Sequence, residues 1–282
     1  MNISGSGPVV LRILLGAELR RLRELAEVTP QQAAHEIGAS ESKISRMERG
    51  RNAFKQEDVA ELLFLYGVSD ETVREDLLSL TRRANQPGWW HSYNDVLPGW
   101  FQPYVGLENA ARRIRTYESH YIPGLLQSPD YAAAVIALDG FRAEELDRRV
   151  TLRRDRQRRF RDGALRLWAI IDEAALRRPF GGAEVMRHQL EELVAATKLP
   201  NLTLQVTPFA VGGHTAPGGF SILRFPDPQM TDVIYVEQLT NALYLDKREE
   251  VDTYLLVMER LSIVSASPTE SIDIINHIMD DY

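Results

Sequence analysis

The sequence predicts a multidomain protein in which a small all-α bundle precedes a larger α+β domain with a mostly antiparallel sheet. Three observations lead to this prediction. Short helical patterns with clear capping residues follow one another up to residue 83. A helix-breaking Gln86-Pro87-Gly88 sequence comes next. From residue 165 onward, apolar and polar residues alternate in short runs, as they do in strands.

We expect four regions along the chain. Residues 1–10 form a loose tail, and residues 11–85 form the helical bundle. Residues 86–106 form a linker, and residues 107–282 form the α+β domain. The linker contains six aromatic residues, namely Trp89, Trp90, Tyr93, Trp100, Phe101 and Tyr104. We interpret them as a hydrophobic clasp between the domains, because no Lys or Arg is interleaved, although such a cluster could also stack nucleobases or line a ligand pocket.

Two short helices joined by a tight turn are predicted within residues 29–51. Thr29 is a good N-cap, and Pro30 falls at the first helical position, where a missing N–H has no cost. Gly38 supplies the turn conformation, and Ser40 caps the second helix. Two such helices, the second rich in small polar and basic residues, are typical of a helix-turn-helix that reads DNA. The alternative is a plain helical hairpin whose charges are solvated.

The outer face of the second helix suits a DNA major groove, which admits one helix and presents a distinct pattern of donors and acceptors at each base pair. Helical spacing directs Ile44, Met47 and Glu48 inward and leaves polar residues outside. The predicted DNA-binding residues are Gln31, Gln32, Ser40, Glu41, Ser42, Lys43, Ser45, Arg46, Arg49, Arg51 and Asn52. Those of the first turn, with Ser45 and Arg46, are expected to read bases. The two glutamines and the three residues from position 49 on are expected to contact phosphates.

The charge of the whole chain is −7, which at first argues against binding to nucleic acid. Residues 1–55 reverse this argument, because they contain nine basic and six acidic residues, a local balance of +3. Affinity for DNA depends on the charges that face phosphates rather than on the sum over the chain. A local charge this small suits a domain that binds well only as a dimer.

Composition excludes several classes of protein. At 282 residues, with 44% hydrophobic and 26% charged residues, the chain is long enough for two domains with real cores. The absence of cysteine excludes disulfides and thiolate chemistry, and we expect no cofactor and no metal. Neither a secretory signal nor an apolar run of ~20 residues occurs, so we expect a cytoplasmic protein without a membrane segment.

The second domain is predicted to contain strands and covering helices. The expected strands are 165–172, 202–207, 220–225, 233–237 and a short 243–245. The expected helices are 107–119, 143–162, 183–197, 251–262 and 269–279. Strands that follow one another after single helices favour a mostly antiparallel α+β layer over a doubly wound parallel sheet.

One predicted helix, 143–162, carries eight arginines, and its acidic residues are concentrated in its first half. Arg154, Arg156 and Arg158 are the candidates there for contact with a partner. The helix could dock an acidic protein, which we prefer, or form a second DNA-contacting surface. The remaining alternative is a solvated helix held by i,i+4 ion pairs.

A second set of polar residues lies at strand ends or in a glycine-rich loop. The further partner or ligand candidates are Asp172, Glu173, His214, Tyr235 and Glu237. A carboxylate and a histidine could serve acid–base chemistry, but no motif organises a reaction, so we predict that the chain is not an enzyme. Convergence of Asp172, His214 and Glu237 in one pocket would argue for catalysis. A dimerisation and partner-binding domain is preferred, with a small-molecule sensor pocket as the alternative.

Residues 14–80 resemble the Xre/Cro-type helix-turn-helix domain of phage-repressor lineage, a lambda-repressor-like bundle of about five helices. The similarity rests on Leu19, Leu22, Thr29, Gly38, Ser40 and the run Ile44-Ser45-Arg46-Met47-Glu48-Arg49-Gly50. The sequence departs from this family at Pro30, where such domains usually carry a glutamine that binds phosphate. Gln31 is the available substitute.

The second domain resembles the domain of unknown function that follows Xre-type domains in actinobacterial, antitoxin-like regulators. The similarity rests on Ile122-Pro123-Gly124-Leu125-Leu126-Gln127, Tyr131-Ala132, Arg156-Gln157, Asp172-Glu173-Ala174-Ala175-Leu176-Arg177-Arg178, Gln189-Leu190, Asn201-Leu202-Thr203-Leu204-Gln205-Val206-Thr207-Pro208 and Tyr235-Val236-Glu237. It implies a cytoplasmic transcriptional regulator that pairs with a small protein from its own gene neighbourhood, and it carries over no catalytic residue. We therefore predict a homodimer that binds double-stranded DNA at two half-sites.

Overall fold

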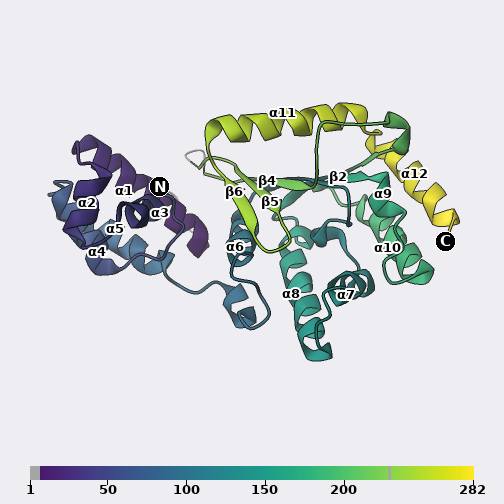
Figure 1. Cartoon of the computed structure of the whole chain (residues 1–282), viewed down its shortest axis with the longest axis horizontal. Helices are drawn as coiled ribbons and strands as arrows, with labels where there is room; N and C mark the ends of the chain where they lie inside the picture. Colours follow the sequence, from purple (N-terminus) through teal and green to yellow (C-terminus); the bar gives the residue numbers. More distant parts are fainter. Residues whose placement is uncertain (1–6, 228–229) are drawn as a thin grey trace. The chain divides into compact units, whose positions relative to one another are not determined.

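The computed structural model describes residues 7–227 and 230–282 and divides the chain into two compact units between Ser92 and Tyr93. The helices of the N-terminal unit are α1 (Pro8–Leu25), α2 (Pro30–Glu36), α3 (Glu41–Glu48), α4 (Gln56–Leu65) and α5 (Glu71–Ala84), followed by the 3-10 helix η1 (Trp89–Tyr93) (Figure 1). Residues 1–6 of the predicted tail lie outside the described residues, and α1 begins at Pro8, within that tail.

The bundle forms around one hydrophobic core to which α1, α3, α4 and α5 contribute. Leu15, Ile44 and Leu63 are among its fully buried members, and Leu77 and Leu80 close it from α5. α2, α3 and α5 each begin after a residue whose side chain accepts a hydrogen bond from a free backbone N–H group. Asp70, for example, accepts from two backbone N–H groups at the start of α5.

Two glycines permit a close approach of α1 to the end of α3. A Cβ atom at Gly50 would lie 2.6 Å from the backbone of Ile13, and Gly50 has a φ of +63°. A Cβ atom at Gly16 would collide with the carbonyl oxygen of Met47. Backbone therefore packs on backbone at this crossing, and α3 has little freedom to shift.

The C-terminal unit is built on one six-stranded sheet. Its strands are β1 (Arg113–Glu118), β2 (Arg166–Asp172), β3 (Leu202–Thr207), β4 (Phe220–Arg224), β5 (Val233–Glu237) and β6 (Ala242–Leu245), in the order β3-β2-β1-β4-β5-β6. Its helices are α6 (Gln102–Ala110), η2 (Gly124–Leu126), α7 (Pro129–Ala137), α8 (Ala143–Arg161), α9 (Glu173–Leu176), α10 (Ala183–Ala196), η3 (Phe209–Val211), α11 (Arg248–Val264) and α12 (Pro268–Asp280).

The sheet is mixed, so the prediction of a mostly antiparallel sheet is wrong. β1 and β2 are parallel, as are β2 and β3, whereas β4, β5 and β6 are joined by antiparallel pairing. The chain returns from β1 to β2 through α7 and α8, and from β2 to β3 through α10. Such helical crossovers are what parallel pairing requires.

One source of this error is β1, because the sequence predicted a helix over 107–119 there. α6 ends at Ala110, and residues Arg113–Glu118 form the strand between β2 and β4. Without β1, one of the two parallel partners of β2 was missing from the prediction, and the other, β3, was predicted as a strand but not as a parallel neighbour. The five predicted strands are confirmed to within a residue or two as β2 to β6.

Helices cover both faces of the sheet (Figure 1). On one face, α11 packs Met258 and Val251 against Tyr117, Ile170 and Ile222. The opposite face is covered by α6, α7 and α8, with the η2 segment between them. Because side chains alternate along a strand, the neighbours of Tyr117 on β1 point toward this second layer.

Candidate functional site

Side-chain N-caps fix the starts of both α2 and α3. Thr29 and Gln32 form a capping box, in which Gln32 N donates to Thr29 Oγ1 at 3.2 Å and Thr29 N donates to Gln32 Oε1 at 2.8 Å. Ser40 Oγ accepts from Lys43 N at 3.3 Å. The cap therefore uses the side-chain oxygen of Gln32 and not its amide NH₂ group, and Gln31 and Gln32 are both exposed.

The helix α3 has one buried and one exposed face. Ile44 and Met47 are each only 1% exposed and anchor the helix in the core. The exposed residues of its outer face are Glu41, Ser42, Arg46 and Arg49, with Lys43 and Ser45 half-buried beside them. Most of the predicted base-reading residues therefore share a solvent-exposed face.

Lys43 differs from the other predicted base-reading residues, because it is already paired. Its Nζ lies 2.6 Å from Oδ2 of Asp58 on α4, and Asp58 is mostly buried. The pair ties α3 to α4. A substitution at Lys43 would leave a buried carboxylate without its partner, so its effect on DNA binding would be mixed with an effect on stability.

A second ion pair fixes α3 to α1. Arg23 Nε donates to Glu48 Oε1 at 2.5 Å, and Arg23 Nη1 donates to the carbonyl of Val28 at 2.9 Å. The hydrogen bond with Glu48 holds the pKa of Arg23 above its usual value. Glu48 thus points inward as its helical position predicts, and its charge is neutralised within the bundle.

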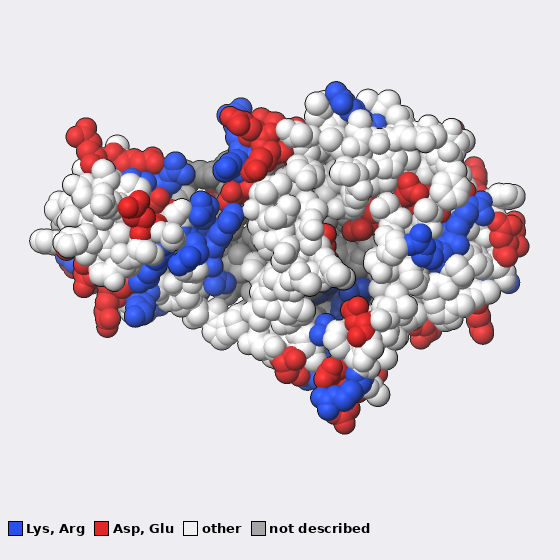
Figure 2. Space-filling view, in the orientation of Figure 1, with Lys and Arg blue, Asp and Glu red and all other residues white. Residues whose placement is uncertain are grey.

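The segment after α3 carries the predicted phosphate contacts. Arg49 and Arg51 are exposed on either side of the Gly50 turn, and Asn52 is half-buried. On the face of the N-terminal unit seen in Figure 2, basic side chains gather on one side and acidic side chains lie around them. This uneven distribution is consistent with a local positive charge, although the net charge of the whole chain is negative.

In the C-terminal unit, Arg156 is buried rather than presented to a partner. Its Nε and Nη2 atoms lie 2.7 and 2.8 Å from the two carboxylate oxygens of Glu108 on α6. The guanidinium also lies over the rings of Phe101 and Tyr104, at 5.0 and 5.5 Å from their centroids. Burial lowers the pKa of Arg156, but the charge of Glu108 outweighs it and raises the pKa above the usual value. Arg154 and Arg158, by contrast, are exposed on α8.

Asp172 and His214 come together at the end of β2, which is part of the convergence that would argue for catalysis. His214 Nε2 lies 3.5 Å from Asp172 Oδ2, and the hydroxyl of Tyr117 lies 2.7 Å from the same nitrogen and 3.2 Å from the carboxylate. Nδ1 of His214 accepts from Ala216 N at 3.3 Å, so the neutral ring carries its proton on Nε2. The cluster fixes the 212–219 loop to the strand end.

The other candidates of this group have separate partners. Glu173 binds Arg177 at 2.6 Å and also accepts from Phe209 N at 2.8 Å. Glu237 accepts from the hydroxyl of Tyr235 at 2.7 Å. Among the described residues no hydrogen bond joins Glu237 to Asp172 or His214, so the three-residue convergence expected of a catalytic site is only partial.

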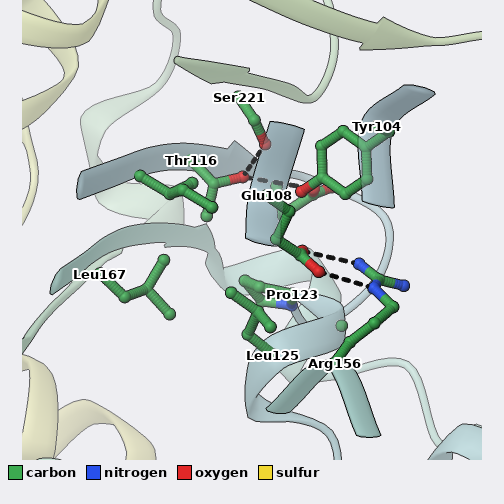
Figure 3. Close-up of a pocket in the computed structure, with 11 residues that line it drawn as sticks. Tyr104, Glu108, Thr116, Pro123, Leu125, Arg156, Leu167 and Ser221 are labelled. Atoms are coloured by element: carbon green, nitrogen blue, oxygen red, sulfur yellow. Dashed lines mark hydrogen bonds and ion pairs between the residues drawn. The ribbon is translucent and has the colours of Figure 1, made fainter. Parts of the chain in front are cut away.

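Sequence reasoning missed a polar pocket between the sheet and α6 and α8 (Figure 3). Its polar walls are Thr116, Glu118 and Ser221 from the strands and Tyr104, Glu108 and Arg156 from the helices. Burial first, and then the nearby charge of Glu237, raises the pKa of Glu118 to about 8. Because β1 was predicted as helix, no signal in the sequence singled out its side chains.

The family motifs of the second domain meet beside this pocket. Gln157 Nε2 donates to the carbonyls of Gly124 and Gln127, at 2.9 Å each. Gln127 Nε2 donates in turn to Ile122 O at 2.8 Å, and Gln189 Nε2 donates to Leu126 O at 2.9 Å. These side chains satisfy the backbone of the η2 segment, so the motif residues build the wall of the pocket.

Two family models match the chain. Residues 101–277 match a domain of unknown function (DUF5753), and residues 14–77 match a helix-turn-helix domain. No match was found among curated proteins or among solved structures. Within the described part of the chain, no helix is long and apolar enough to cross a membrane. The first family match covers more than half of the chain, and the second lies within the helical bundle.

Proposed function

We propose that this chain, which belongs to the DUF5753 family and carries a helix-turn-helix domain, is a sequence-specific DNA-binding transcriptional regulator. The observation that carries the proposal is the geometry of α3. It buries Ile44 and Met47 and exposes Glu41, Ser42 and Arg46 on one face, as a helix that enters the major groove must do.

The side chains on this face have distinct roles in the proposal. Glu41 accepts from a cytosine amine, and Arg46 donates to the two acceptors of guanine. Arg49 and Arg51 lie at the end of α3 and after it, where they bind phosphates and position the helix without reading sequence. Lys43 serves mainly to hold α3 against α4, because Asp58 already neutralises it.

Replacing Arg46 with alanine is expected to weaken binding to a preferred duplex by about 10- to 100-fold and to relax the preference at one base pair, because one bidentate base contact is lost. Replacing Arg51 is expected to weaken binding to all sequences alike. The measurement is a mobility-shift titration of the full chain with duplexes selected from a random pool and with scrambled duplexes.

Arg82→Ala is the matched control, because it removes the same charge from an exposed position at the end of α5. It should change neither affinity nor preference by more than a few-fold. Equal losses on selected and scrambled duplexes for Arg46→Ala and Arg51→Ala alike would contradict the assignment of α3 as the reading helix.

We further propose that the regulator acts as a homodimer of the Xre type, with the C-terminal unit as the dimerising part. The local charge of +3 in residues 1–55 motivates this proposal, since one such bundle neutralises few phosphates. Two bundles would bind half-sites about 34–36 Å apart.

Inserting about five base pairs between the half-sites is expected to abolish cooperative binding, because half a helical turn places the second site on the opposite side of the duplex. An insertion of about ten base pairs returns the second half-site to the same side of the duplex but lengthens the spacing. It should therefore recover part of the affinity for DNA. Sedimentation of the full chain gives the oligomeric state. A monomeric protein whose affinity for DNA does not change with the insertion would contradict the proposed dimer.

In the same proposal, a small acidic protein modulates the regulator through the exposed arginines of α8, as the resemblance to antitoxin-like regulators suggests. Arg154 and Arg158 are exposed there, whereas Arg156 is committed to Glu108. The cluster of Tyr117, His214 and Asp172 has a structural role in this proposal and no catalytic one.

A further inference from the structure

The pocket of the C-terminal unit has an acidic group that the chain itself does not neutralise. The space is a small cavity of about 30 Å³ that lies between β1 and β4 on one side and α6 and α8 on the other (Figure 3). Glu108 and Arg156 both line it, but each neutralises the other through two short hydrogen bonds. The charge balance of the pocket therefore depends on Glu118.

Glu118 has one weak hydrogen bond and no cation beside it. Thr116 Oγ1 lies 3.4 Å from Glu118 Oε1, and among the described residues no Lys or Arg forms an ion pair with this carboxylate. Gly219 leaves room for the other oxygen, since a Cβ atom there would lie 2.8 Å from Glu118 Oε2. The missing side chain at Gly219 therefore leaves room for the carboxyl group of Glu118.

The ionisable groups around Glu118 are Glu237 from β5, Tyr104 from α6, Tyr117 on β1 itself and the paired Glu108 and Arg156. Arg153 on α8 is also buried nearby, and its charge interacts with those of Glu237 and Glu108. Burial of the Glu118 carboxyl and the negative charge of Glu237 act in the same direction and raise the pKa of Glu118 to about 8. At neutral pH the empty pocket therefore holds a proton on Glu118, which a bound cation would displace.

The other residues that line the pocket indicate which kind of cation would fit there. Thr116 Oγ1, Ser221 Oγ and the hydroxyl of Tyr104 are further hydrogen-bonding groups, and their residues are all buried. A protonated primary amine has three N–H donors to place among these oxygens. Ile114 and Leu167 add an apolar wall, and the small volume of the cavity admits only a short ligand.

We propose that this pocket binds a small aliphatic primary amine, with the ammonium group on the Glu118 carboxylate and the short carbon chain against Ile114 and Leu167. An anionic ligand is disfavoured, because the Arg156 guanidinium that lines the pocket is already paired with Glu108, and the negative charge of Glu237 acts on Glu118 as well. The proposal goes beyond DNA binding and does not depend on it.

Calorimetric titration of the full chain with methylamine, ethylamine and n-butylamine tests this proposal, and 1-butanol is the neutral counterpart. At least one amine is expected to bind with measurable heat, whereas 1-butanol is expected not to bind. The heat should depend on the ionisation enthalpy of the buffer, because binding releases the proton of Glu118. Affinity should fall about tenfold for each pH unit below about 8.

Glu118→Gln should lower the affinity for the bound amine at least tenfold and remove both the proton release and the pH dependence. This variant retains the shape of the protonated side chain, so its circular dichroism and melting temperature at neutral pH should match those of the parent. Glu191→Gln, a charge change on the exposed face of α10, is the matched control and should bind as the parent does. Equal binding of 1-butanol, binding unchanged by Glu118→Gln, or no binding of any amine would overturn the proposal.

Discussion

Replacing Gly50 with alanine is expected to displace α3 and to abolish specific DNA binding. Gly50 has a φ of +63°, and an L-residue there costs about 1–2 kcal/mol. The new methyl group would also lie 2.6 Å from the backbone of Ile13, which no rotamer change can relieve. Together these effects should cost more than about 3 kcal/mol, because a helix of the core must move.

Gly67→Ala is the matched control for this substitution. Gly67 also has a positive φ, of +73°, but a Cβ atom there would meet nothing within 4 Å. It should cost only about 1 kcal/mol and leave DNA binding intact. Hydrogen exchange of the full chain, read over α1 and α3, separates the two variants. Equal protection and equal DNA affinity in both would contradict the close packing of α1 on α3.

The bundle shows what helical spacing can predict. The periodic positions of Ile44 and Met47 predicted the buried face of α3, and both are buried. The Thr29 and Ser40 caps are confirmed as well, since each accepts from the backbone of its helix. These features are local, because a cap and a face depend on residues three or four positions apart. Lys43 is different, because its partner Asp58 lies on another helix fifteen positions on.

The C-terminal unit shows where local patterns mislead. Leu107, Ala110, Ala111 and Ile114 recur at helical spacing, which supported the predicted helix over 107–119. The alternation from Arg113 to Glu118 competes with that pattern, and pairing with β2 and β4 decides in favour of the strand. Those partners begin some fifty and a hundred residues further on, so no local window contains them.

The pocket was missed for the same reason. Glu118 and Thr116 have a common direction only on a strand, and a helix would have separated them. Asp172 and His214, in contrast, could be named from the sequence as residues that can meet, because a strand end and a glycine-rich loop can approach each other without knowledge of the sheet order. Their bridging partner, Tyr117, lies on the strand that the prediction lacked.

Replacing Glu108 with alanine is expected to destabilise the C-terminal unit by about 3–5 kcal/mol. The side chains of Glu108 and Arg156 are 4% and 6% exposed, so the substitution would leave a buried guanidinium without a counter-charge. Removing an exposed partner, as in Glu191→Ala of the half-exposed Arg187–Glu191 pair, should change stability by less than about 1 kcal/mol. Denaturant unfolding followed by circular dichroism measures both.

The double variant Glu108→Leu/Arg156→Met distinguishes two possible causes of the stability loss in Glu108→Ala. If the loss in Glu108→Ala arises from an uncompensated buried charge, removing both charges and keeping the volume should restore most of the stability. If it arises instead from lost packing of Arg156 over Phe101 and Tyr104, the double variant should be no more stable than Glu108→Ala. We expect restoration, because methionine retains an unbranched chain against both rings, whereas an unpaired charge in the same place has no solvent to stabilise it.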